Sequence, residues 1–151
     1  YLEIGTFTGY ATLCLAEGLQ EGGILHTIDI NAEQQERVQG YFDESAFADK
    51  IRYHIGDAAI ILPTLDETFD LVFIDADKKR NLYYFETIIN QVPSGGLILI
   101  DNVLWKGKVL DSKPDNQTKQ IIDLNARLAQ DKRVEKVILP IRDGLFALRK
   151  K

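Results

Sequence analysis

Short apolar runs alternate with helical patterns along the whole of this 151-residue chain. The predicted strands at residues 69–74 and 97–100 contain the unbroken apolar runs LVFI and LILI, and a helical pattern at residues 78–92 lies between them. Strands with two apolar faces occur where helices cover both sides of a sheet. Alternation of such strands with helices therefore predicts a doubly wound α/β fold with a mostly parallel sheet.

The other predicted elements continue this alternation within one domain, residues 1–151. Strand patterns lie at residues 1–4, 24–30, 51–55, 69–74, 97–100, 134–139 and 145–148. Further helical patterns lie at residues 8–20, 31–45 and 117–130, and a short helix ends near Pro63. The link between the last two strands is too short for a parallel crossover, which predicts an antiparallel final pair. Because the chain lacks methionine and starts inside a strand, we expect its N-terminal part to be absent.

Charge and cysteine content exclude several classes of function. Lys and Arg number 18 against 23 for Asp and Glu, so the net charge is −5. Proteins that bind nucleic acid through phosphates usually have a basic face, so we expect no nucleic acid partner. The single cysteine, Cys14, cannot form an internal disulfide and is predicted to pack in the core. A chain with one cysteine and no long apolar run suits a cytoplasmic protein without a membrane segment.

Ligands of doubly wound sheets bind at the carboxyl ends of the strands, so the residues that follow each strand matter most. The first strand leads into residues 3–9 (EIGTFTG), in which Gly5 and Gly9 lie four residues apart. This spacing differs from the G-x-G-x-x-G dinucleotide motif and suits a cofactor without a pyrophosphate. A tight strand–helix turn with no ligand would explain the same residues.

Acidic residues follow the second and third strands. Asp29 lies 20 residues beyond Gly9, where an acid can accept both hydroxyls of a ribose. Capping of the next helix together with Asn31 is the alternative, and the nearby glycine turn favours the ribose role. Asp57 would face an adenine amino group or cap the short helix, and the sequence leaves both readings open.

Two further carboxylates end the fourth and fifth strands, Asp75 and Asp101, and Asn102 follows directly. If these two strands are neighbours, they lie about 4.8 Å apart, and the two carboxylates would stand side by side and repel each other. A cation that prefers oxygen ligands, such as Mg²⁺, relieves this repulsion. No His or Cys lies nearby in the sequence, which argues against a zinc site. Taken singly, Asp75 could simply start a helix and Asp101 could start a turn.

Lys78 lies three residues after Asp75, at the start of a predicted helix. A cation is poorly placed there for the helix dipole, and a lysine beside a metal can act as a general base. Its alternative is a solvated member of the basic run at residues 78–80 (KKR).

Together these segments resemble the cation-dependent class I O-methyltransferases that use S-adenosylmethionine, a family that includes catechol and caffeoyl-CoA O-methyltransferases. The bacterial branch is the most similar. The matching segments occur in the family's order at residues 3–10 (EIGTFTGY), 27–31 (TIDIN), 73–78 (FIDADK) and 95–105 (GGLILIDNVLW). The resemblance implies a seven-stranded Rossmann-like sheet with an antiparallel last strand, and methyl transfer to a hydroxyl of a catechol-like acceptor.

The resemblance also implies a role for each matching residue. Asp75, Asp101 and Asn102 would hold the cation, which is Mg²⁺ with Mn²⁺ or Ca²⁺ as alternatives, and Lys78 would deprotonate the acceptor. The implied cofactor-binding residues are Glu3, Gly5 and Tyr10 along the methionine end, Asp29 at the ribose, Asp57 and Ala58 near the adenine, and Asp75 and Asp77 elsewhere in the pocket.

The expected partners are a small aromatic diol and a second copy of the chain in a homodimer. The loop at residues 104–115 would cover the site, where Trp105 either stacks on the acceptor or packs the loop. A nicotinamide-dependent oxidoreductase and a non-catalytic cofactor-binding module are the alternative functions. The missing G-x-G-x-x-G motif counts against the first, and the set of Asp75, Lys78, Asp101 and Asn102 counts against the second.

Overall fold

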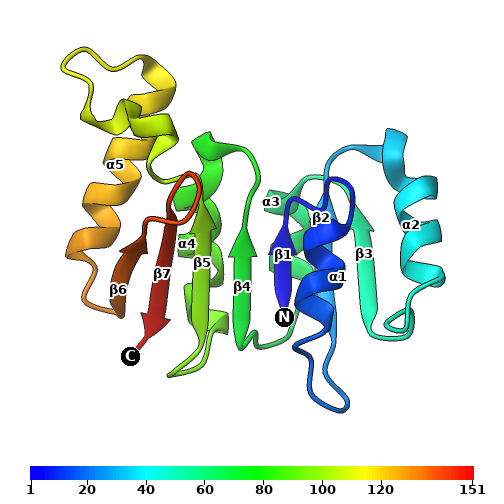
Figure 1. The fold of residues 1–151 in the computed structure, drawn as a ribbon. Helices are drawn as coiled ribbons and strands as arrows, with labels where there is room; N and C mark the ends of the chain where they lie inside the picture. Colours follow the sequence, from blue (N-terminus) through cyan, green and yellow to red (C-terminus); the bar gives the residue numbers. More distant parts are fainter. The chain divides into compact units, whose positions relative to one another are not determined.

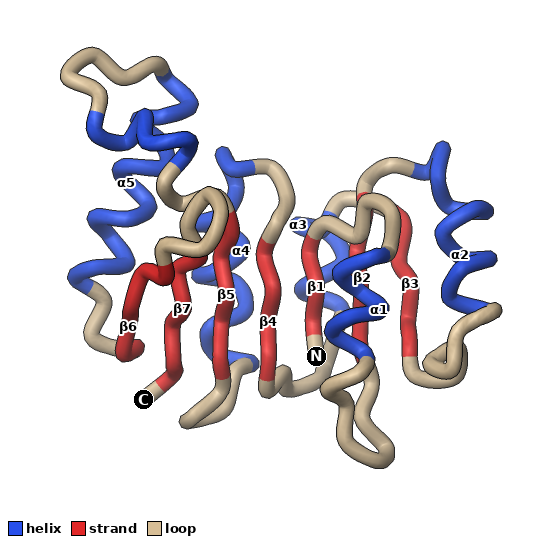
Figure 2. Tube along the Cα trace, in the orientation of Figure 1, coloured by secondary structure: helices blue, strands red, loops and turns tan.

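A computed structural model describes residues 1–151, which form two compact units, residues 1–67 and 68–151. Strands and helices alternate along the chain in both units until the last two strands, which follow one another directly (Figures 1 and 2). The seven strands follow the order β3-β2-β1-β4-β5-β7-β6. This order, with an antiparallel β7, confirms the predicted doubly wound α/β fold.

The first unit is built on three parallel strands. β2 pairs with both β1 and β3. All residues of β1 and of β3 have a register partner in β2. Its strands are β1 (Leu2–Ile4), β2 (Leu25–Asp29) and β3 (Ile51–Ile55), and its helices are α1 (Tyr10–Ala16), α2 (Gln35–Asp43) and α3 (Ala58–Ile61).

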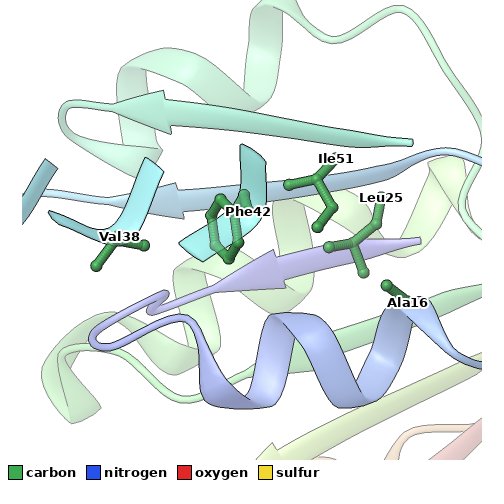
Figure 3. Packing of buried hydrophobic residues seen from close by; sticks show 5 residues of the cluster. All are labelled: Ala16, Leu25, Val38, Phe42 and Ile51. Atoms are coloured by element: carbon green, nitrogen blue, oxygen red, sulfur yellow. The ribbon is translucent and has the colours of Figure 1, made fainter. Parts of the chain in front are cut away.

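Two helices of this unit share one apolar cluster with the strands. Figure 3 shows its five buried members, which come from α1, β2, α2 and β3 and are Ala16, Leu25, Val38, Phe42 and Ile51. Each is at most 7% exposed. Because residues of α1 and α2 meet the same strands, both helices cover the same face, and the apolar area that they bury stabilises the unit.

Gly9 is required where the turn after β1 enters α1. Its φ is 79°, and a Cβ there would lie 2.7 Å from Phe42 Cε1. We expect Gly9→Ala to lower the free energy of unfolding by about 2–4 kcal/mol, because backbone strain adds to overpacking. Gly22→Ala is the matched control, since Gly22 has φ 74° with no atom within 4 Å of its Cβ. Urea unfolding that gave equal losses for both variants would contradict the role of Phe42.

Two histidines stack between β2 and β3. The rings of His26 and His54 lie 5.2 Å apart, with His26 Nδ1 3.0 Å from His54 Nε2. His26 Nε2 lies 2.8 Å from Glu67 Oε2. Burial lowers the pKa of both histidines, and the Glu67 carboxylate offsets only part of this effect.

This pair makes stability depend on pH. As the pH falls, the histidines of the unfolded chain take up protons first, near their ordinary pKa of about 6.5. The stabilisation is therefore complete above that pH and is lost as the pH falls through the lower folded pKa values. We expect urea unfolding to give a declining free energy of unfolding from about pH 7.5 to about pH 5.5, with a shallower decline in His54→Gln. A stability that rose on acidification would refute this assignment.

The second unit has four strands. β5 pairs with β4 in parallel and with β7 antiparallel, and β7 also pairs antiparallel with β6. The strands are β4 (Leu71–Ile74), β5 (Leu97–Asp101), β6 (Val134–Leu139) and β7 (Leu145–Lys150), and the helices are α4 (Asn81–Ile88) and α5 (Asn116–Gln130). The antiparallel final pair is thus confirmed.

Some local predictions need correction. Cys14 is exposed rather than packed in the core, because the apolar cluster takes Ala16 from α1 instead. The helix predicted at residues 8–20 is shorter, since Gly9 is its N-cap and the chain turns at Gly18. No helix in the structure has both the length and the apolar character that a bilayer crossing needs.

Candidate active site

The turn after β1 is tied to the end of β2 by Asp29. Its Oδ2 accepts a hydrogen bond from the backbone N–H of Phe7 at 2.6 Å, and Oδ1 accepts one from Asn31 N–H at 2.8 Å. Phe7 has a left-handed φ of 48°, so the first bond holds a strained turn. A carboxylate has about four lone-pair positions, which leaves acceptor capacity for hydroxyl donors. The bracing role of Asp29 is therefore compatible with its predicted ribose role.

Gly5 lets the chain leave β1 at a sharp angle. Its φ is 108°, which favours glycine, and its N–H donates to the carbonyl oxygen of Ile28 at 2.9 Å. The Gly5 backbone therefore stays next to the end of β2. A position without a side chain here suits the predicted close approach of a cofactor.

Glu3 is fully buried in β1. Its Oε2 accepts hydrogen bonds from the hydroxyls of Thr12 in α1 and Thr27 in β2. The Thr27 hydroxyl also shares a 2.6 Å hydrogen bond with the Thr6 hydroxyl. A buried carboxylate needs such donors, so Glu3 braces β1, β2 and α1 around the glycine turn. Contact of Glu3 with a cofactor stays a prediction.

The other predicted cofactor residues of this unit lie at helix starts. Tyr10 begins α1 and is 76% exposed, and its hydrogen bond with Cys14 raises the pKa of the Tyr10 phenol. Asp57 caps α3, where its Oδ1 accepts from Ala59 N–H at 2.9 Å, and Ala58 is buried. Capping uses one oxygen of Asp57, and the predicted adenine contact is not tested by this bond.

In the second unit, two carboxylates follow paired positions of β4 and β5. Ile74 and Ile100 are register partners in this parallel pair, and Asp75 and Asp101 come next in each strand. They therefore project from the same edge, as the sequence predicts. Asn102 follows with a left-handed φ of 61°, and its N–H donates to Asp101 Oδ1 at 2.6 Å.

Lys78 points back to this edge. Its Nζ lies 2.6 Å from Asp75 Oδ1, and its side chain is only 11% exposed. The reading of Lys78 as a solvated member of a basic run is therefore wrong. Asp77 Oδ1 accepts from Lys79 N–H at 3.1 Å and caps the turn that brings Lys78 round.

A sequence profile of O-methyltransferases matches residues 1–151. The chain belongs to the O-methyltransferase family. Caffeoyl-CoA O-methyltransferase 1 of Eucalyptus globulus is 38% identical over 162 residues, covering 99% of this chain and 65% of the relative. Catechol O-methyltransferase domain-containing protein 1 of Mus musculus is 36% identical, covering 95% of this chain and 57% of the relative. The chain thus spans less than two thirds of the length of these family members.

Solved structures of the family agree with the fold. The O-methyltransferase TomG from Streptomyces achromogenes, in complex with SAM, has a TM-score of 0.90 and 32% identity. The O-methyltransferase from Bacillus cereus, in complex with SAH, has a TM-score of 0.91 and 30% identity. Each match covers 99% of this chain, and 72% and 73% of the respective neighbour.

The residues at the β4–β5 edge fit a divalent cation of the kind that the family resemblance implies. Asp75 and Asp101 offer carboxylate oxygens and Asn102 offers an amide oxygen, the donors that hard cations prefer. The structure contains no group of three or more His, Cys, Asp or Glu side chains suited to a metal. The predicted set has only two carboxylates, and its third ligand is an amide.

The β6–β7 turn is a part of this edge that sequence reasoning missed. Asp143 Oδ1 accepts from Lys106 N–H, and the Asp143 carbonyl oxygen accepts from Leu104 N–H at 2.9 Å. The carbonyl oxygen of Gly144 accepts from Val103 N–H at 3.1 Å. The turn thus holds the segment that follows Asn102. Its Asp-Gly pair is a turn signal in the sequence, but nothing there indicates what the turn contacts.

Proposed function

We propose that the full-length protein transfers the methyl group of S-adenosylmethionine to a hydroxyl of a small aromatic acceptor with two neighbouring hydroxyls, in a reaction that needs a divalent cation. Family membership and the SAM and SAH in the Streptomyces and Bacillus structures support the reaction. The names of the relatives support the acceptor class, since caffeoyl and catechol groups both carry neighbouring hydroxyls.

The cofactor side of the proposal rests on the glycine turn and Asp29. Asp29 would accept the ribose hydroxyls with the capacity that its two backbone contacts leave. Gly5 would let the backbone approach the methionine end, and Tyr10 would lie beside it. The remaining proposed contacts are those of Glu3, Asp57, Ala58, Asp75 and Asp77.

The acceptor side rests on Asp75, Asp101 and Asn102. Together they would offer three oxygen ligands to a hard divalent cation, fewer than such a cation takes, so it would also be able to bind two acceptor hydroxyls. A bound divalent cation lowers the pKa of a hydroxyl that it contacts and fixes the position of the oxygen. An acceptor with one hydroxyl would lose one of these contacts.

Lys78 is the proposed general base. Methyl transfer forms an oxygen–carbon bond and breaks the sulfur–carbon bond, whose electron pair returns to sulfur, while the hydroxyl loses its proton. The amine form of Lys78 would accept that proton. Its Nζ contacts Asp75, so the base stands beside a residue that would help to hold the acceptor.

One observation carries the metal-dependent part of the proposal. The parallel register of β4 and β5 brings Asp75 and Asp101 to one edge, and Asn102 follows at once. A Rossmann-like oxidoreductase has no need of this set, and family membership argues against that alternative.

The test is methyl transfer from labelled S-adenosylmethionine to aromatic diols by the full-length protein, with Mg²⁺ and then with EDTA. We expect turnover that EDTA abolishes and added Mg²⁺ restores. Turnover that persists in EDTA would overturn the metal requirement and leave the methyl transfer. Binding of S-adenosylhomocysteine without turnover of any diol would overturn the acceptor class. Failure to bind this product would overturn the cofactor as well.

A further inference from the structure

We propose that Lys106 and Arg142 form an anion subsite beside the predicted metal ligands, and that the acceptor therefore carries an anionic group in addition to its hydroxyls. The inference rests on the proposed methyl transfer and names the acceptor class more closely. The group is a carboxylate near the ring or a phosphate on a longer tail, since the same two cations recognise either one.

Both cations border one cavity of the second unit. It has a volume of about 710 Å³, within the range of sites for small molecules. Asp101 and Asn102 lie in its wall together with Lys106 and Arg142, and the apolar lining residues are Phe73, Ile141 and Leu145. An aromatic acceptor bound at Asp101 and Asn102 would therefore rest on apolar walls with two cations within the same cavity.

Neither cation is held in an ion pair within the protein. The side chains of Lys106 and Arg142 take part in no ion pair, although other cations of this unit do, such as Lys78 and Arg133. Asp143 also borders the cavity, but its Oδ1 accepts the backbone N–H of Lys106. Neither side chain is therefore tied to one carboxylate of the protein. The cavity also holds the carboxylate of Asp101, whose charge a cation at the predicted metal site would offset. A ligand carboxylate or phosphate suits a guanidinium particularly well.

The backbone holds both cations in unfavourable conformations. The φ angles of Lys106 and Arg142 are 55° and 49°, a left-handed region that long side chains rarely adopt. Five non-glycine residues of the protein have a positive φ, and four of them lie at residues 102–106 or in the β6–β7 turn: Asn102, Trp105, Lys106 and Arg142. Strain of this kind concentrates where a side chain must be held for binding. Hydrogen bonds from the segment that carries Lys106 to Asp143 and its turn hold the backbone in this strained conformation.

The experiment compares three acceptors with the full-length protein: caffeate, its methyl ester and caffeoyl-CoA. Caffeate and the ester differ by one carboxylate charge, and caffeoyl-CoA places phosphates on a long tail. KM is measured for each, and dissociation constants are measured by calorimetry with S-adenosylhomocysteine and Mg²⁺ present. The variants are Lys106→Gln, Arg142→Gln and their combination. Lys108→Gln is the control, because Lys108 lies on the same segment and outside the cavity lining.

We expect an anionic acceptor to have the lowest KM. Each single substitution should reduce the ratio of the KM of the ester to the KM of the anionic acceptor by about threefold to fivefold. The double variant should lose about tenfold, and high salt should reduce the advantage in the unchanged protein. An effect on caffeate would identify a carboxylate, and an effect on caffeoyl-CoA alone would identify a phosphate.

Equal KM values and dissociation constants for the acid, the ester and the thioester would overturn the subsite while methyl transfer stood. So would an equal loss for all three acceptors in the variants, since that would indicate a structural defect. If no acceptor were methylated, the proposed function would fail, and the dissociation constants would still decide whether the cavity prefers an anion.

Discussion

Replacement of Asp101 by alanine is expected to lower kcat/KM for an aromatic diol by about 100-fold or more, which corresponds to about 2.7 kcal/mol of lost transition-state stabilisation. Asp101 ends β5 next to Ile100, whose register partner Ile74 precedes Asp75. Asp75 and Asp101 are therefore the two carboxylates that this strand pair brings together. Its loss would leave one carboxylate and one amide for the cation. The measurement is the rate of methyl transfer as a function of Mg²⁺ concentration.

The fold should survive this change. Asp101 makes one side-chain hydrogen bond, to the N–H of the adjacent Asn102, and the strand pairing of β5 uses backbone groups. Asp123→Ala, on the exposed side of α5, is the matched control for the loss of one negative charge. Turnover of Asp101→Ala at the rate of the control would mean that the cation is not held by this residue.

The second large effect is expected for Asp29→Ala. A charge-assisted hydrogen bond contributes about 1.5–3 kcal/mol, so the loss of even one ribose contact should raise the dissociation constant of S-adenosylhomocysteine by about 10- to 100-fold. The affinity for Mg²⁺ should not change, because Asp29 is not one of the predicted metal ligands. Calorimetric titration with each ligand separates the two affinities.

Asp29 also braces the turn at Phe7, so a structural defect must be distinguished from a lost contact. Asp29→Asn keeps one acceptor oxygen for that turn and removes the charge. Asp43→Ala removes a charge from the end of α2 and serves as the control. An unchanged dissociation constant in both Asp29 variants would refute the ribose contact.

The sequence predicted the elements that repeat a simple physical pattern. Apolar runs such as those of β4 and β5 identify strands covered on both faces, and a link as short as residues 140–144 permits only an antiparallel pair. Strand order then brings Asp75 and Asp101 to one edge without any knowledge of side chains. Burial of Glu3 under threonine hydroxyls was not predicted, because it depends on contacts between α1, β1 and β2.

Contacts between distant segments explain the rest. Lys106 and Arg142 belong to residue types that favour neither a left-handed backbone nor a cavity, so their sequence positions carry no signal. Their placement follows from the bonds of Asp143 across 37 residues. The exposure of Cys14 was not predicted for a similar reason. Helical spacing shows which residues share a face of the helix, but it does not show how wide the buried part of that face is.

The ion pair between Lys78 and Asp75 bears on the order in which the protein is assembled. The lysine ammonium already supplies a positive charge to the edge where two carboxylates end their strands. Folding then has no need to wait for a metal, unlike small domains whose only source of order is the ion they bind. If the proposed cation site holds, a chelator should stop turnover without unfolding the protein, and turnover should return when the cation is added back.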